Sequence, residues 1–124
     1  MTLQQLQPIR IIARPKRFPM GEHWGVQLPD GSVIHLTPEG LFHVVLEAFL
    51  EDKNFRVVRD ADPARRSQII WRVAQVLQQP PQYRVTNQNC EVFANWLLGD
   101  PPKSPQVKGM LLLGAIALVL HLAE

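Results

Sequence analysis

The stretch TNQNCEVFANWLLG, residues 86–99, decides the fold, because it contains the only cysteine of the chain and has the pattern of a complete short helix. Three good helix N-caps lie among its first residues: Thr86, Asn87 and Asn89. Four apolar residues then recur at the spacing of one buried helical face: Val92, Phe93, Trp96 and Leu97. Gly99, followed by Asp100-Pro101-Pro102, ends the pattern. The sequence therefore predicts a short helix with Cys90 in or near its first turn.

This position has a chemical consequence for Cys90. A thiol in the first turn of a helix lies at the positive end of the helix dipole, which favours the thiolate and so predicts a nucleophile at neutral pH. A second interpretation is that Cys90 is a small buried apolar residue with no chemical role. Structural thiols outnumber catalytic ones, so the cysteine by itself leaves both interpretations open.

A β-hairpin is predicted upstream, from His23 to Leu36, with Pro29-Asp30-Gly31 as its turn. Proline suits the first central position of a type I turn, and glycine suits the left-handed position that closes a three-residue loop. The loop length sets the pairing of the two strands.

With this loop, Leu28 lies opposite Ser32 and His35 lies opposite Gly25. Gly25 shares a strand face with His23, because side chains alternate with period two. The two histidines are therefore predicted on one face of the hairpin. A two-residue turn would place them on opposite faces. The other face is predicted to be core and carries Trp24, Val26, Ile34 and Leu36.

The rest of the chain predicts further short elements. They are a strand over Ile9–Ala13 that ends at Arg14-Pro15, a strand over Leu41–Val45, a helical turn over Leu46–Leu50, a strand over Phe55–Val58, and a helix that begins at Asp62-Pro63 and ends at Pro80-Pro81. The last helix has an apolar stripe of Ile69, Val73, Val76 and Leu77. His43 has no evident partner and is interpreted as structural.

Composition limits the class of protein. A chain of 124 residues is long enough for one domain, and its single cysteine excludes an intramolecular disulfide. No apolar signal segment follows Met1, so a cytoplasmic location is expected. A net charge of +2 with 19% charged residues does not favour a nucleic-acid partner. The cations that precede the first acid are Arg10, Arg14, Lys16 and Arg17; they suit either anionic lipid headgroups or an edge strand protected against aggregation.

The C-terminal residues 109–123 contain no Asp, Glu, Lys or Arg. A helix over this run would extend about 22 Å, at about 1.5 Å per residue. This is less than the roughly 30 Å hydrocarbon core of a bilayer, so the run is a marginal membrane span. Because it is apolar on every side, it is not expected to be an ordinary surface helix.

Cys90, His23 and His35 together supply a nucleophile, a base and a residue that orients the base, which is the arrangement of cysteine hydrolases and acyltransferases. A zinc site built from the same three residues and His43 is a lesser alternative, because the histidines are on strands without the usual ligand spacing. No metal or cofactor is therefore expected.

Two separated motifs resemble the lecithin retinol acyltransferase family. The first is HWGV at residues 23–26 with DG at 30–31 and VIHL at 33–36; the second is YRVT at 83–86 with NCEVFANW at 89–96. The resemblance extends from about Ile9 to Val107. It implies a circularly permuted papain-like α+β fold, with an antiparallel sheet packed against the cysteine helix.

The resemblance also implies a division of the chain and a chemistry. Residues 1–106 would form the catalytic domain, and residues 107–124 a hydrophobic segment that is a possible membrane anchor. The implied activity is acyl hydrolysis or transfer on phospholipid-type esters through a cysteine thioester. Carried over by position, Cys90 is the nucleophile, His23 the general base and acid, and His35 the residue that orients His23.

Two other functions remain open at this point. One is a peptide or amide hydrolase related to bacterial cell-wall peptidases, although such an enzyme would need an export signal. The other is a catalytically silent interaction or membrane-remodelling module that keeps the fold. The reactivity of Cys90 distinguishes the silent module from the two enzymes.

Overall fold

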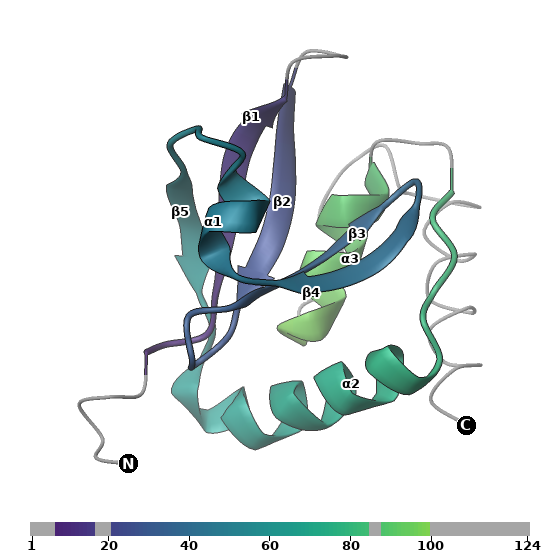
Figure 1. The fold of residues 1–124 in the computed structure, drawn as a ribbon. Helices are drawn as coiled ribbons and strands as arrows, with labels where there is room; N and C mark the ends of the chain where they lie inside the picture. The colour runs from purple at the N-terminus through teal and green to yellow at the C-terminus, as the bar shows by residue number, and fades with distance from the viewer. Residues whose placement is uncertain (1–6, 17–20, 85–87, 100–124) are drawn as a thin grey trace.

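The chain folds as an α+β protein, in which a five-stranded antiparallel sheet has helices on both faces (Figure 1). The computed structural model describes residues 7–16, 21–84 and 88–99. Its elements in chain order are β1 (Arg10–Lys16), β2 (Gly21–Gln27), β3 (Val33–Thr37), β4 (Gly40–Val44), α1 (Leu46–Leu50), β5 (Arg56–Asp60), the 3-10 turn η2 (Pro63–Arg65), α2 (Arg66–Gln78) and α3 (Gln88–Leu97). The strand order is β4-β3-β2-β1-β5.

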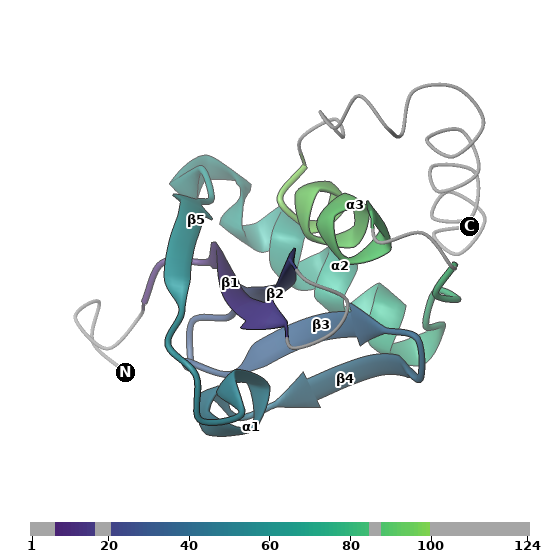
Figure 2. The same ribbon diagram turned by 90° about the horizontal axis from the view of Figure 1, so that it is seen from above.

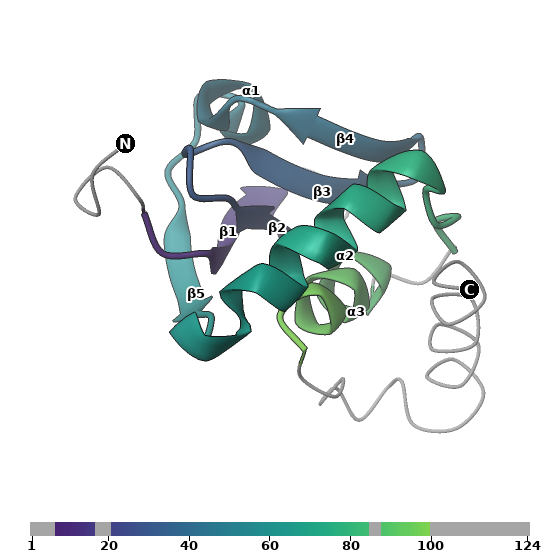
Figure 3. The same ribbon diagram turned by 90° about the horizontal axis from the view of Figure 1, so that it is seen from below.

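The two faces of the sheet are covered differently. Helices α2 and α3 lie together over one face, and the short helix α1 lies on the other side of the sheet (Figures 2 and 3). The larger core lies between the sheet and the two long helices; its most buried members include Ile11, Val26, Ile34, Ile69, Val76, Ala94 and Leu97. A smaller core under α1 contains Ile12, Val33 and Phe49. Both helical layers bury apolar surface against the sheet.

The predicted hairpin register is confirmed. The Leu28 amide donates to the Ser32 carbonyl at 2.8 Å, and the Gly31 amide donates to the Leu28 carbonyl at 2.8 Å. Gly31 has a φ of +90°, the left-handed value that a three-residue loop requires of its last residue. The hydrogen-bonded ladder pairs Gln27 with Val33 and Val26 with Ile34, and in this register Gly25 and His35 are the next positions along the two strands.

Strands β2 and β3 separate beyond this point. Their ladder contains two residue pairs, whereas β1 and β2 pair along seven positions from Arg10–Gln27 to Lys16–Gly21. In Figure 1, β3 and β4 diverge from β2, and α3 packs beside the divergence. The part of β2 that precedes Val26 therefore has no β3 partner, and its backbone is accessible to a group from α3.

Two expectations about β1 are wrong. The strand does not end at Pro15 but continues to Lys16, and β1 lies between β2 and β5 rather than at an edge. Proline is tolerated because the pairing of β1 with β5 runs from Arg10 to Ala13 and has ended before Pro15 is reached. Arg14 is buried, so the N-terminal cations do not form one solvated patch.

The helix predictions hold with two corrections. The helix predicted to begin at Asp62-Pro63 begins with the 3-10 turn η2, and α2 itself begins at Arg66. In α2, Ile69, Val73 and Val76 are buried as predicted, but Leu77 is 45% exposed, because it lies at the edge of the buried face. In α3 the predicted helix is confirmed, and it ends before Gly99, which adopts a left-handed φ of +85°.

The predicted C-terminal segment, residues 107–124, lies outside the described residues, as do the predicted caps at residues 86 and 87. Within the described ranges, no helix is both long enough and apolar enough to cross a bilayer.

Gly25 packs where no other residue fits. A Cβ atom at this position would lie 2.7 Å from Cγ1 of Val33 and 2.8 Å from Cε1 of Phe49. Real Cβ atoms do not approach other carbons this closely, so the smaller core closes over the missing side chain. Gly25 thereby allows Phe49 to reach the strand face on which the histidines lie.

We expect Gly25→Ala to lower the free energy of unfolding by about 1–3 kcal/mol, because Val33 and Phe49 must move to admit the methyl group. Urea unfolding of the variant and of the parent protein measures this loss. The same substitution in a Phe49→Leu background should cost less, since the smaller side chain relieves one of the two contacts. Equal losses in both backgrounds would contradict the proposed contact with Phe49.

Candidate active site

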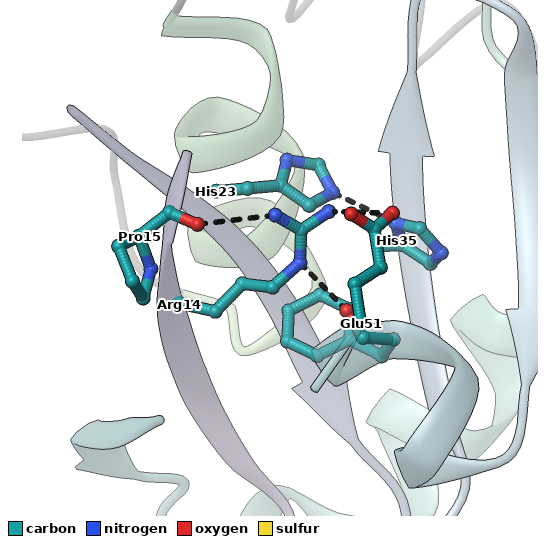
Figure 4. Close-up of polar contacts among 6 residues, drawn as sticks. Arg14, Pro15, His23, His35 and Glu51 are labelled. Carbon is teal, nitrogen blue, oxygen red and sulfur yellow. Dashed lines mark hydrogen bonds and ion pairs between the residues drawn. The ribbon is translucent and has the colours of Figure 1, made fainter. Parts of the chain in front are cut away.

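The two predicted histidines meet on the α1 face of the sheet. Nε2 of His23 lies 2.7 Å from Nδ1 of His35, a hydrogen bond between two buried imidazoles (Figure 4). The two rings are arranged edge to face, with an interplanar angle of 70°. The other nitrogen of His23 points away from His35 in Figure 4 and has no hydrogen-bond partner among the described residues. His23 is thus held through one nitrogen and leaves the other for chemistry.

Phe49 and Arg14 support this pair. The ring of Phe49 lies 5.6 Å from that of His23 and 5.2 Å from that of His35, between ring centroids. Arg14 is directly opposite His23 in the β1–β2 ladder, and its Nε donates to the Phe49 carbonyl at 2.6 Å. Its Nη2 lies 3.4 Å from a carboxylate oxygen of Glu51 (Figure 4). Arg14 therefore ties β1 to the end of α1, which keeps the Phe49 ring against both imidazoles.

Burial keeps both imidazoles neutral. Desolvation lowers the pKa of His23 to about 3, with further lowering by the charges of His35, Arg14 and Lys16. Desolvation, followed by the charge of Arg14, lowers the pKa of His35 to about 4. At neutral pH the pair is uncharged, so one imidazole donates the shared proton and the other accepts it.

Cys90 lies on α3, as predicted, at the third position of the helix and in its first turn. Its side chain is buried, and the backbone of Trp24 hydrogen-bonds to its sulfur. Trp24 follows His23 on β2, in the part of the strand where β3 has diverged. The fold thus brings the thiol to the backbone position next to His23.

The expected thiolate is not what the surroundings favour. Burial raises the pKa of the Cys90 thiol and is the largest effect. The backbone hydrogen bonds from Trp24 and Glu91 and the charge of Lys16 act in the opposite direction and are smaller. This balance contradicts the expectation of a resting thiolate, because desolvation is the largest effect on the thiol. At rest the Cys90 thiol and the imidazole pair are all neutral.

A pocket of about 380 Å³ opens over the histidines. Its lining residues are Arg14, Lys16, His23, His35, Thr37, Pro38, Glu39, Glu51 and Lys53. This volume is within the range of small-molecule sites. Its lining thus combines the imidazole pair with five charged side chains: Arg14, Lys16, Glu39, Glu51 and Lys53.

His43 does not join the site. It is exposed on β4, paired in the sheet with Ile34, and its Nε2 lies 2.7 Å from Oγ of Ser32. Ser32 Oγ in turn lies 2.5 Å from a carboxylate oxygen of Asp30, which accepts its proton. His43 therefore donates to a hydroxyl that caps the hairpin turn. Among the described residues, no cluster of three or more histidine, cysteine or acidic side chains is placed to hold a metal ion.

Sequence reasoning missed Arg14 and Phe49. The sequence places Arg14 in a basic edge, because its position opposite His23 depends on the β1–β2 register, which no turn motif in the sequence of residues 17–20 specifies. Phe49 belongs to a helix of five residues, too short for its apolar pattern to indicate which face it covers. The signal for Phe49 was Gly25, whose lack of a side chain between two histidines leaves room for a ring.

Individual related proteins, rather than a family model, assign the chain to a family. No family model matches the sequence. The mouse (Mus musculus) protein "Phospholipase A and acyltransferase 3" is 31% identical, over 73% of this chain and 70% of its own length. The human (Homo sapiens) protein of the same name is 27% identical, over 80% of this chain and 75% of its own length. The rat (Rattus norvegicus) "Phospholipase A and acyltransferase 5" is 29% identical, over 77% of this chain and 40% of its own length.

The chain is an α+β domain, and its paired histidines and buried cysteine are the candidate residues of a cysteine site. The chain belongs to the lecithin retinol acyltransferase-like family, which includes the phospholipase A and acyltransferase proteins. The family resemblance noted in the sequence is confirmed.

Because the folded protein keeps both histidines neutral, we expect its free energy of unfolding to fall in mild acid. The unfolded chain takes up protons on both imidazoles below a pKa of about 6.5, whereas the folded chain does so near 3 and 4. Protonation therefore favours the unfolded state as the pH falls from about 6.5 toward 4, by up to about 1.4 kcal/mol per pH unit for each histidine.

Urea unfolding between pH 6.5 and pH 4.5 measures this slope. We expect His23→Gln/His35→Gln to have a shallower slope than the parent, since two residues that take up protons on unfolding are absent. The carboxylates contribute in both proteins and cancel in the difference. An unchanged slope in the double variant would show that the imidazoles are not held neutral.

Proposed function

We propose that this protein is a cysteine-dependent acyl hydrolase or acyltransferase that acts on phospholipid-type esters. The observation that carries the proposal is the 2.7 Å hydrogen bond between His23 Nε2 and His35 Nδ1, because it fixes one nitrogen of His23 and leaves the other as a base. The names of the family relatives support the substrate class. The proposal includes a permuted papain-like arrangement, with Cys90 on α3 and the histidines on the sheet.

The first step begins from a neutral Cys90 thiol and a neutral His23 imidazole. Nδ1 of His23 takes the proton of the Cys90 thiol as the sulfur attacks the ester carbonyl, so thiolate and imidazolium form together. His23 then carries protons on both nitrogens, and its Nε2–H donates to Nδ1 of His35. This bond orients the ring and stabilises its positive charge. His35 is thus a positioning residue that acts through His23.

The second step releases the first product. His23 gives its proton to the leaving alcohol oxygen as the tetrahedral intermediate collapses, which leaves an acyl thioester on Cys90. Backbone N–H groups near the start of α3 are candidates for stabilising the oxyanion. Water or an amine, deprotonated by His23, then attacks the thioester carbonyl; the C–S bond breaks, and the Cys90 sulfur leaves and takes the proton back from His23. The same site is a hydrolase with one acceptor and a transferase with the other.

The burial of Cys90 and His23 supports a mechanism in which their charges form at the same time. In a low-dielectric site, separated charges are costly and a close pair of opposite charges is much less so. Cys90 and His23 are both neutral at rest and become charged together. Arg14 disfavours an isolated imidazolium, so the proton moves to His23 only as the negative charge develops on sulfur and then on the carbonyl oxygen.

We expect the three residues of the site to differ in their contribution to turnover. Cys90→Ala should abolish acyl release from a short-chain phosphatidylcholine, and His23→Ala should reduce it by about a hundredfold or more. His35→Ala should reduce it less, because orienting a base contributes less than being one. His43→Gln is the matched control, since it removes an exposed histidine outside the pocket and should retain parent activity.

Intact-protein mass spectrometry tests the intermediate directly. After incubation with mixed phospholipids, the parent should carry one acyl group, and Cys90→Ala should carry none. Acyl release that persists at the parent rate in Cys90→Ala would overturn the mechanism in favour of a silent module. Selective cleavage of amides with no cleavage of esters would instead favour a peptide hydrolase.

We further propose that the apolar run at residues 109–123 contributes to membrane binding. Deletion of residues 109–124 should then reduce flotation with phosphatidylcholine liposomes, because it removes most of the contiguous apolar sequence. The histidine hydrogen bond lies in the described domain, so cleavage of a soluble short-chain ester should be retained. Unchanged flotation would contradict the anchor.

A further inference from the structure

The charges in the histidine pocket are not balanced. Arg14 and Glu51, two of its lining residues, form an ion pair at 3.4 Å. Lys16 and Lys53 also line the pocket, and neither forms an ion pair among the described residues. Glu39 is the other acid in the lining, and it forms no ion pair among the described residues. The pocket therefore has two lysines against one unpaired carboxylate.

Lys16 is close enough to influence both reacting residues. It is the last residue of β1, two positions beyond Arg14 on the same strand face. Its charge lowers the pKa of His23 and that of Cys90. An anion that contacts Lys16 would lie in the pocket that His23 and His35 also line.

Lys53 comes from a different element. It follows α1, and its backbone amide donates to the Leu50 carbonyl at 2.9 Å, which fixes the loop from which its side chain extends. Lys16 and Lys53 are thus held by the sheet and by the α1 layer respectively. Two ammonium groups on separately anchored backbones are suited to contact different oxygens of one anion.

A phosphodiester fits these features. In a glycerophospholipid the phosphate is joined to the scissile ester through the glycerol carbons, so an ester carbonyl at the histidines places the phosphate within the same pocket. Phosphate oxygens accept charge-assisted hydrogen bonds from lysine, which acts as a compact point charge. The volume of about 380 Å³ holds a headgroup but not the acyl chains, which must extend beyond it.

We propose that Lys16 and Lys53 bind the phosphate of the phospholipid and make the pocket selective for phosphodiesters over uncharged acyl esters. This inference rests on the proposed function for the identity of the substrate. The binding of the phosphate does not require catalysis, so it is tested separately.

The binding experiment uses the full chain and a lipid that cannot be cleaved. The dihexyl diether analogue of phosphatidylglycerol has one phosphate charge and no ester, and the dihexyl diether of glycerol is its uncharged counterpart. Isothermal titration calorimetry below the aggregation concentration should give binding of the phosphate compound about tenfold weaker for Lys16→Gln/Lys53→Gln than for the parent, and about threefold weaker for each single variant. Binding of the uncharged diether should be unchanged.

The matched control is Arg66→Gln. It removes one positive charge from α2, on the opposite face of the sheet, and should leave binding of the phosphate compound within about twofold of the parent. Circular dichroism establishes that each variant is folded. Equal binding by the double variant and the parent, or no binding by the parent, overturns the proposal. So does inorganic phosphate that binds as tightly as the diether lipid, because the site would then select free phosphate.

A turnover measurement separates this inference from the proposed function. Because the charge of Lys16 also acts on the pKa of His23 and of Cys90, the double variant can change kcat for both esters alike. It should raise KM for dihexanoylphosphatidylglycerol and leave KM for dihexanoylglycerol unchanged. An equal rise in KM for both esters would mean that the lysines act on ester binding in general or on the fold rather than on the phosphate. Absence of cysteine-dependent cleavage of either ester by the parent would overturn the proposed function, while the calorimetric result would still decide the lysine site.

Discussion

The register of the β2–β3 hairpin governs the rest of the site. A loop of three residues, closed by the left-handed Gly31, places His35 across from Gly25 and hence on the face of His23. A shift of one residue would turn one imidazole toward α2 and α3, and the 2.7 Å hydrogen bond could not form. The same register puts the side-chain-free Gly25 where the Phe49 ring packs. A local turn therefore determines a contact between residues that are twelve positions apart.

The divergence of β2 and β3 gives the proposed site access to both faces of the sheet. The histidines belong to the α1 face, whereas α3 packs on the opposite face. Because the β2–β3 ladder ends at Val26, the backbone of Trp24 is available to the Cys90 sulfur. A continuous ladder would use that backbone for strand pairing.

Burial is the largest influence on the charge state of the site. The helix terminus and two backbone hydrogen bonds favour a thiolate, but desolvation raises the pKa of Cys90 and lowers those of both histidines. A neutral pair costs less to bury than an ion pair. The consequence for the proposed mechanism is that charge appears only during the reaction, when thiolate and imidazolium form side by side.

Local patterns in the sequence determined the turn at Pro29–Gly31, the shared face of the two histidines and the helix that carries Cys90, because each depends on a few neighbouring residues and on strand or helix period. They did not determine the position of Arg14, the cover provided by Phe49, or the protonation of Cys90. Those depend on which segments pack together: β1 lies inside the sheet, α1 closes over Gly25, and burial outweighs the helix terminus. Contacts between distant segments and the loss of water around them arise only in the tertiary structure, which is why a local pattern does not predict them.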